Sequence, residues 1–140
     1  MEDVLAGILP AKALQISVSN HWKNGIELSA PLQPNRNDKG TAFAGSIESI
    51  LTLAGWALIT RELQAAGIDA DVMVVKNETE FTTAVRDSFS AETSMTPEDA
   101  AELFQSLNIR GRGRQKLTIF LHAQKKKCAV MTAHFAVIRR

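Results

Sequence analysis

The chain has 140 residues, of which 45% are hydrophobic and 22% charged, and its formal net charge is +1. A chain of this length and composition can bury a full core, which excludes a disordered, collagen-like or coiled-coil architecture. We therefore expect one domain covering residues 1–140.

The first predicted strand covers Ala13 to Ser19, where apolar and polar residues alternate. A turn at residues 20–25 joins it to a second alternating segment that ends at Pro31, so the two segments predict a hairpin. Residues 31–40 contain two prolines and one glycine and are predicted to form a long ordered loop.

A long helix is predicted from Phe43 to Ala66, with Gly67 as its left-handed cap. Glu48 is the only charged residue between positions 43 and 59, and apolar residues occupy every face of this helix. Protein must therefore surround it on most sides, which makes it the central core helix. A membrane span is the competing interpretation, but the run contains polar residues and stops at Arg61, short of the about 20 apolar residues that a span needs.

The second half of the chain predicts more strands and one short helix. Val72 to Val85 is a strand in which positions 77, 79 and 81 share one face and positions 78 and 80 the other. A turn leads to a short strand, Phe89 to Glu92. Thr96 is predicted to cap the start of a helix, because a proline and then two acidic residues follow this threonine. The helix is expected to end near Asn108.

Two glycines after this helix open a last hairpin, residues 116–124 and 128–138, whose strands are joined by a lysine-rich turn. These elements predict an α+β domain with roughly six antiparallel strands, one long central helix and a small extra helix.

Charge is distributed unevenly: nine of the 16 basic residues and none of the 15 acidic residues lie between positions 103 and 140. This polarity suggests an anionic partner near the C-terminal strands, although solvation of strand ends would also explain it. Nucleic acid is not expected, because aromatic residues are 6% of the chain and none lies among these basic residues.

Cysteine and histidine usage gives no sign of a metal site. Cys128 is the only cysteine, which excludes an internal disulfide framework. The three histidines are dispersed and lack paired acidic ligands, so we expect no metal and no separate cofactor. The acidic start has no signal-peptide pattern, and we expect a cytoplasmic protein without membrane attachment.

The start of the long helix is the most informative segment for chemistry. A polar loop leads into Ala44 and Gly45 at the first helical turn. Helix N-termini carry unpaired N–H groups, and a small residue lets a ligand approach them, so this turn can polarise a carbonyl oxygen. Tight packing is the alternative reason for the glycine.

The first hairpin, the loop, the helix start, the turn at residues 81–89 and the Arg-Gly-Arg-Gly-Arg entry to the last hairpin at residues 110–114 together resemble a hot-dog fold. This resemblance covers nearly the whole chain. Residues 39–46, Lys-Gly-Thr-Ala-Phe-Ala-Gly-Ser, together with residues 53–56, Leu-Ala-Gly-Trp, resemble the putative thioesterase domain found at the C-terminus of some bacterial acetyltransferases and as a stand-alone protein. The resemblance implies a sheet wrapped around the helix, a homodimer or a dimer of dimers, and an acyl-thioester pocket at the dimer interface.

In hot-dog thioesterases of the phenylacetyl-CoA type, a loop asparagine precedes a His-Gly-Gly helix start, and a carboxylate follows along the helix. By position, Asn37 matches that asparagine, and Phe43 replaces the histidine. Thr52 stands where the carboxylate would be, and a threonine cannot act as a general base near neutral pH. Glu48 lies one turn earlier on the same helix face and is its candidate replacement.

The resemblance thus implies a set of candidate site residues. The catalytic candidates are Asn37, Gly45, Glu48 and Thr52. The candidate substrate-binding residues are Phe43, Ala44, Ser46, Asn77, Thr79, Arg112 and Arg114. The two arginines are expected to hold phosphates of coenzyme A, because a guanidinium group matches phosphate geometry.

The expected function is hydrolysis of an acyl-CoA or acyl-carrier-protein thioester, with coenzyme A present only as part of the substrate. The alternative is a non-hydrolytic module that binds acyl thioesters beside an acyltransferase, which the missing carboxylate favours.

Overall fold

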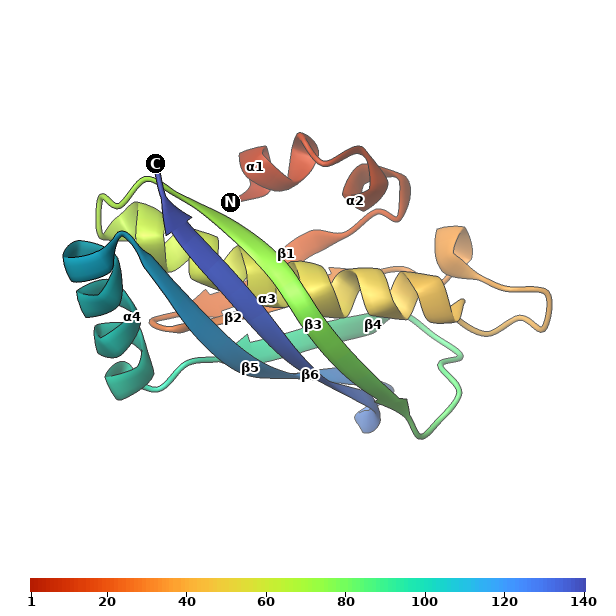
Figure 1. The fold of residues 1–140 in the computed structure, drawn as a ribbon. Helices are drawn as coiled ribbons and strands as arrows, with labels where there is room; N and C mark the ends of the chain where they lie inside the picture. Colours follow the sequence, from red (N-terminus) through yellow and green to blue (C-terminus); the bar gives the residue numbers. More distant parts are fainter.

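Six antiparallel strands form one curved sheet in the computed structural model, which describes residues 1–140 (Figure 1). The strands are β1 (Ser17–Trp22), β2 (Gly25–Ala30), β3 (Ala70–Phe81), β4 (Phe89–Ser94), β5 (Arg112–Ala123) and β6 (Lys126–Arg139). Their order across the sheet is β1-β2-β4-β5-β6-β3, so β1 and β3 are the two edges. The predicted α+β architecture is confirmed.

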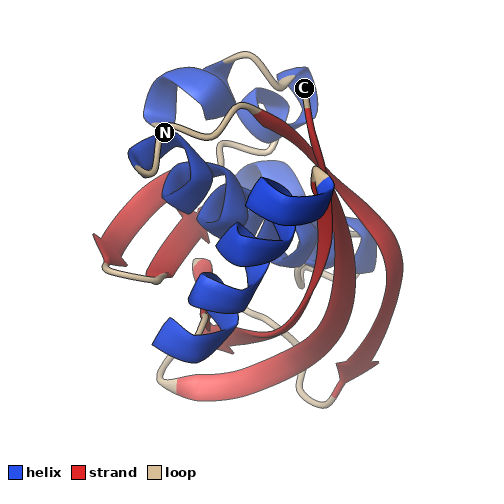
Figure 2. Ribbon diagram, turned by 60° about the vertical axis from the view of Figure 1, so that its left-hand side comes forward, coloured by secondary structure: helices blue, strands red, loops and turns tan.

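The long helix α3 (Ala44–Ala65) runs along the concave side of the sheet, which curls around it (Figure 2). Gly67 follows it with φ +72°, the left-handed conformation that glycine adopts without strain. Gly55 faces Phe135 on β6, and a Cβ atom at this position would lie 2.7 Å from the ring. Close packing against the sheet therefore explains this glycine. No helix is long and apolar enough to cross a membrane.

The N-terminal segment differs from the prediction. Residues Glu2–Ala6 and Leu9–Ala13 form two short helices, α1 and α2, which the alternation pattern did not reveal. The first strand begins only at Ser17, because Gln15 has a positive φ of 58° and breaks the extended backbone before it. The predicted hairpin is confirmed, but its turn is shorter than residues 20–25, since β1 continues to Trp22 and pairs there with Gly25.

The small helix α4 (Pro97–Arg110) begins as predicted, with the backbone N–H of Asp99 donating to Thr96 Oγ1 at 3.0 Å. It covers a part of the sheet where β4 and β5 have separated, because their pairing is limited to residues 90–93 and 119–122. Ser106 Oγ on α4 donates to the carbonyl of Arg112 on β5 at 2.6 Å. The helix α4 thereby covers the part of β5 that has no pairing with β4.

The two edge strands differ in how they are protected. On β1, the Val18 N–H donates to Glu2 Oε1 of α1 at 2.5 Å, so a side chain blocks that edge. On the other side of the sheet, β3 pairs only with β6. Exposed apolar side chains lie along β3: Met73, Val74, Val75 and Phe81. A bare, partly apolar edge of this kind is typical of a strand that pairs with another chain.

Candidate active site

A stripe of partly exposed residues follows one face of α3, between residues buried by the sheet. Its members recur at intervals of three or four residues: Gly45, Glu48, Ser49, Thr52, Leu53 and Trp56. This spacing places them on the same side of a helix. The predicted catalytic residues on α3 therefore share one face, which the sheet leaves partly open.

The first turn of α3 has free hydrogen-bond donors. The N–H groups of Ala42 and Phe43 are occupied, since they donate to the carbonyls of Val85 and Asn35 at 2.8 and 2.7 Å. The N–H groups of Ala44 and Gly45 have no acceptor, and no side chain caps the helix. These two donors are the pair that the sequence singled out.

Phe43 modifies the expected role of Gly45. The ring of Phe43 is 57% exposed and lies against Gly45, where a Cβ atom would be 2.4 Å from its Cε2 atom. The glycine therefore makes room for this ring as well as for any ligand. Because the ring is largely in solvent, it can rotate away from Gly45.

The loop before α3 is held by two asparagines. Asn37 Nδ2 donates to Thr41 Oγ1 at 2.9 Å, and Asn37 Oδ1 accepts from the N–H groups of Lys39 and Thr41 at 2.8 and 3.1 Å. Both ends of the Asn37 amide are thus engaged within the loop. To position water, this amide would have to exchange one of these bonds.

Asn35 is a residue that the sequence reasoning did not select. It is 2% exposed, and its Nδ2 donates to the carbonyls of Leu14 and Pro31 at 2.9 and 2.8 Å. Its own carbonyl accepts from the Phe43 N–H, so Asn35 joins α2, the loop and the start of α3. The only sequence feature that could have pointed to Asn35 is its place in a proline-containing loop. This feature does not distinguish a buried amide from an exposed one.

The open face of α3 meets the inner face of β3. Thr52 Oγ1 lies 3.8 Å from Met131 Sδ on β6, and Met131 is the register partner of Thr79 on β3. Thr79 Oγ1 is buried without a hydrogen-bond partner. Asn77 lies two residues away on the same face of β3 and is exposed. We call this region between α3 and β3 the α3–β3 seam.

Three of the candidate residues lie elsewhere. Ser46 is only 4% exposed and lies on the buried side of α3. Arg112 and Arg114 are register partners of Ile138 and Ala136, whereas the neighbouring Val137 is fully buried beneath the sheet. The two arginines therefore project from the outer face of the sheet, and the sheet separates them from the seam.

The charges near the seam are few. Glu48 is half-buried, and its carboxylate has no hydrogen-bond or ion-pair partner. Hydrogen bonds to Asp69 and Asp71 raise the pKa of the Arg140 guanidinium, which lies at the end of β6. Along the chain, Glu48 is the carboxylate nearest to the first turn of α3.

Comparison with known proteins gives a family and a fold. The model of a family described as "Putative thioesterase (yiiD_Cterm)" matches residues 4–139. A putative thioesterase from Shewanella oneidensis is 25% identical with a TM-score of 0.88, over 98% of this chain and 94% of that chain. None of the curated proteins is similar enough to count as a match.

Two further solved structures have the same fold at lower identity. A Chlorobaculum tepidum protein of unknown function has a TM-score of 0.93 at 21% identity, over 99% of this chain and 92% of that chain. A probable thioesterase from Pseudomonas aeruginosa has a TM-score of 0.87 at 17% identity, over 99% and 93%. The hot-dog fold expected from the sequence is confirmed.

Proposed function

The chain belongs to the family of putative thioesterases whose model covers residues 4–139, and we propose that it hydrolyses acyl thioesters in the α3–β3 seam. The observation that carries this proposal is the pair of free N–H groups on Ala44 and Gly45, at the end of a helix face that also holds an unpaired carboxylate.

The free N–H groups would stabilise the negative charge that develops on the thioester oxygen. When water adds to the carbonyl carbon, the oxygen becomes an oxyanion, and donors fixed in advance stabilise it more than they stabilise the substrate. The partial positive charge at the helix start acts in the same direction. Phe43 lies over Gly45 and would contact the acyl group or the thioester as it enters.

Glu48 would act as the general base. It lies four residues before Thr52, and both side chains are on the open stripe of α3. In this scheme the Glu48 carboxylate takes a proton from the attacking water and returns one to the leaving thiolate. Asn37 would help to position the water, and Thr52 would contribute a hydroxyl but no base.

A second copy of the chain would complete the seam. Asn77 and the unpartnered Thr79 hydroxyl lie on β3, which is the unprotected edge of the sheet. An isologous dimer formed by two β3 edges would extend the sheet and cover its exposed apolar side chains. Acyl-CoA and acyl-carrier-protein thioesters are both proposed substrates, since both carry the same pantetheine thioester.

The second candidate function is binding of an acyl thioester without hydrolysis. Thr52 favours it, because this residue occupies the place of a carboxylate in the enzymes that the sequence resembles. The free donors on the first turn of α3 would serve a binding module equally well.

The test is hydrolysis of a panel of acyl-CoA esters, followed with a thiol reagent. We expect Glu48→Gln to lower kcat by about 100-fold or more, the usual loss for a general base. We expect Asn37→Ala to lower it as well. Glu78→Gln is the matched control, because Glu78 lies on the opposite face of β3.

Thr52→Asp should raise hydrolysis by placing a second carboxylate on the open stripe. Full activity of both Glu48→Gln and Asn37→Ala would refute these roles. Binding of an acyl-CoA by the wild-type protein without any hydrolysis would favour the binding module.

A further inference from the structure

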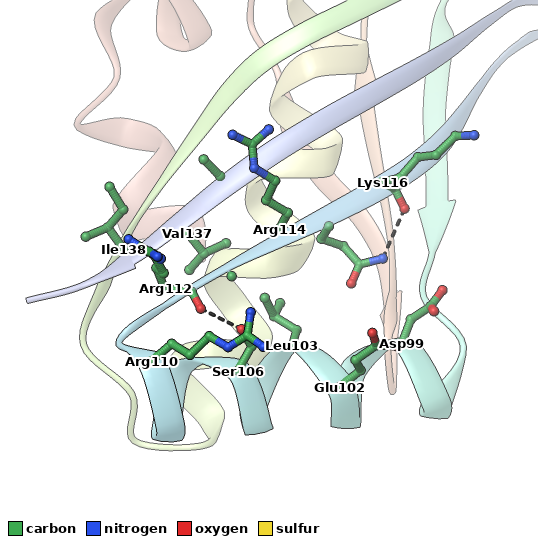
Figure 3. Close-up of a pocket in the computed structure, with 13 residues that line it drawn as sticks. Asp99, Glu102, Leu103, Ser106, Arg110, Arg112, Arg114, Lys116, Val137 and Ile138 are labelled. Atoms are coloured by element: carbon green, nitrogen blue, oxygen red, sulfur yellow. Dashed lines mark hydrogen bonds between the residues drawn. The ribbon is translucent and has the colours of Figure 1, made fainter.

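The first half of β5 has a neighbouring strand on only one side. It pairs with β6 from Arg112 onward, but its pairing with β4 on the other side covers only residues 119–122. Helix α4 lies where β4 has separated, and a groove with a volume of about 780 Å³ remains between α4 and β5 (Figure 3). We call it the α4–β5 groove.

The backbone of β5 directs hydrogen-bonding groups into this groove. Thr93 Oγ1 on β4 donates to the carbonyl of Thr118 at 2.9 Å, so this carbonyl points away from β6. The residues of a strand direct their N–H and C=O groups alternately to one side and to the other. Arg112, Arg114 and Lys116 therefore also direct theirs away from β6, toward the groove.

Side chains occupy two of these carbonyl groups. Ser106 Oγ on α4 donates to the carbonyl of Arg112 at 2.6 Å, and Gln115 Nε2 donates to that of Lys116 at 3.0 Å. Gln115 is only 8% exposed, so a nearly buried amide stands where a neighbouring strand would supply an N–H. The N–H and C=O of Arg114 lie between these positions, without a strand or side-chain partner on the groove side. We call residues 112–116 of β5 the open edge.

The groove widens along the open edge. At one end α4 packs closely on β5, since a Cβ atom at Gly113 would lie 2.8 Å from Leu103 Cδ1. From there the strand and the helix diverge toward Lys116 (Figures 1 and 3). A further strand would lie about 4.8 Å from β5, on the side where the groove is. An open strand edge beside such a groove is the arrangement that binds an extended peptide by strand addition.

The side chains of the open edge indicate the charge of such a peptide. Arg112, Arg114 and Lys116 project from the outer face of the sheet, away from α4, and none of them has an acidic partner. Residues directly opposite them on an added strand would have Cβ atoms about 4.5–5.5 Å away, and opposite charges attract at this distance. Acidic side chains are therefore favoured on the outer face of the added strand.

The inner face of the added strand would have a different environment. Leu103 lines the groove on this side, and so do Asp99 and Glu102 on the first turns of α4 (Figure 3). The two carboxylates repel acidic side chains, whereas Leu103 can pack against apolar ones. Because successive side chains of a strand point to opposite faces, acidic and apolar residues should alternate in the peptide.

We propose that the open edge of β5 binds an extended segment of another protein as an additional strand. Its acidic side chains lie beside Arg112, Arg114 and Lys116, and its apolar side chains face α4. Main-chain hydrogen bonds to Arg114 hold the segment, and its next N–H replaces the Gln115 amide on the carbonyl of Lys116. This interaction goes beyond the proposed hydrolysis and does not depend on it, because it uses neither the seam nor a second copy of the chain.

Amide hydrogen exchange of the whole protein, followed by NMR, tests the open edge without a partner. We expect the N–H groups of Arg114 and Lys116 to exchange at least about 100-fold faster than those of Gln115 and Leu117, which face β6. Protection of the Arg114 N–H that increases with protein concentration would show that a second copy occupies the edge. Protection at every concentration would show that the edge is closed within one chain. Either result would overturn the proposal.

Titration with a capped Glu-Val-Glu-Val-Glu peptide tests binding. We expect it to shift and protect the N–H groups of Arg114 and Lys116, while Lys-Val-Lys-Val-Lys does neither. N-methylation of the central glutamate removes one main-chain donor and keeps every side chain, so it should weaken binding by about tenfold. No binding of the acidic peptide at millimolar concentration, or equal binding of the methylated peptide, would overturn the proposal.

Two variants of Arg114 separate its charge from its backbone. Arg114→Ala keeps the N–H and should weaken binding of the acidic peptide by about threefold, the loss of one exposed ion pair. Arg114→Pro also removes the N–H and should weaken it by about a further tenfold; the β5–β6 pairing, which does not use this N–H, should remain. Lys125→Ala is the matched control, because it removes one charge at the β5–β6 turn and should leave binding unchanged. The methylated peptide tests the same contact in the wild-type protein, so the conclusion does not depend on the folding of Arg114→Pro.

Discussion

Gly55→Ala is expected to destabilise the protein although alanine is the better helix former. The new Cβ would lie 2.7 Å from two atoms of the Phe135 ring, which is fully buried and cannot move aside. Replacing glycine within a helix gains about 1 kcal/mol, whereas overpacking a core costs about 1–3 kcal/mol. We expect a net loss of about 1 kcal/mol of unfolding free energy, or about 3–4 °C in Tm for a chain of this size.

Gly45→Ala is the matched control in the same helix. Its Cβ would lie 2.4 Å from the Phe43 ring, but this ring is 57% exposed and can rotate into solvent. The unfolding free energy should therefore stay within about 0.5 kcal/mol of the wild-type value, as for most surface changes.

Urea unfolding and calorimetry measure the unfolding free energy and Tm of both variants. Adding Phe135→Leu to Gly55→Ala should recover part of the lost unfolding free energy, because the smaller side chain makes room beside the helix. The reasoning fails if Gly55→Ala is as stable as the wild type, or if Gly45→Ala loses as much as Gly55→Ala.

Two further predictions concern the sheet edge and the loop before α3. The double variant Val74→Asp/Val75→Asp should convert the proposed dimer into a monomer, because it places four like charges where the two β3 edges meet. Light scattering at micromolar concentration measures the oligomeric state of both proteins. A monomeric wild type would contradict the proposed dimer. Asn35→Ala should lower the unfolding free energy by about 1–3 kcal/mol, since it leaves the carbonyls of Leu14 and Pro31 without their buried donor. Urea unfolding tests the second prediction, and wild-type stability would refute it.

Elements with strong local signals were predicted well. The alternation in β2, the capped start of α4 at Thr96 and the glycine after α3 each depend on neighbours within a few residues. The segment before Ser17 was missed, because helices of five residues are too short to show a periodic pattern. The alternation from Ala13 onward was consequently assigned to the first strand, which begins only at Ser17.

The candidate site was predicted unevenly for a related reason. The free N–H groups of Ala44 and Gly45 follow from the position of a helix start, which the sequence located within one residue. The burial of Asn35 and the internal hydrogen bonds of Asn37 depend on how a loop folds back on itself. Residue type and spacing do not determine such contacts.

The sequence by itself determined the succession of the six strands along the chain, the central position of α3 and the two-sided pattern of β3, because periodicity and caps are local properties of the chain. Only the tertiary structure decided which face of each strand points inward and which elements become neighbours. It placed Thr79 beside Met131 in the seam and put Arg112 and Arg114 on the other side of the sheet. The physical reason is that alternation separates two faces of a strand, while burial against α3 selects between them through contacts between residues far apart in the chain.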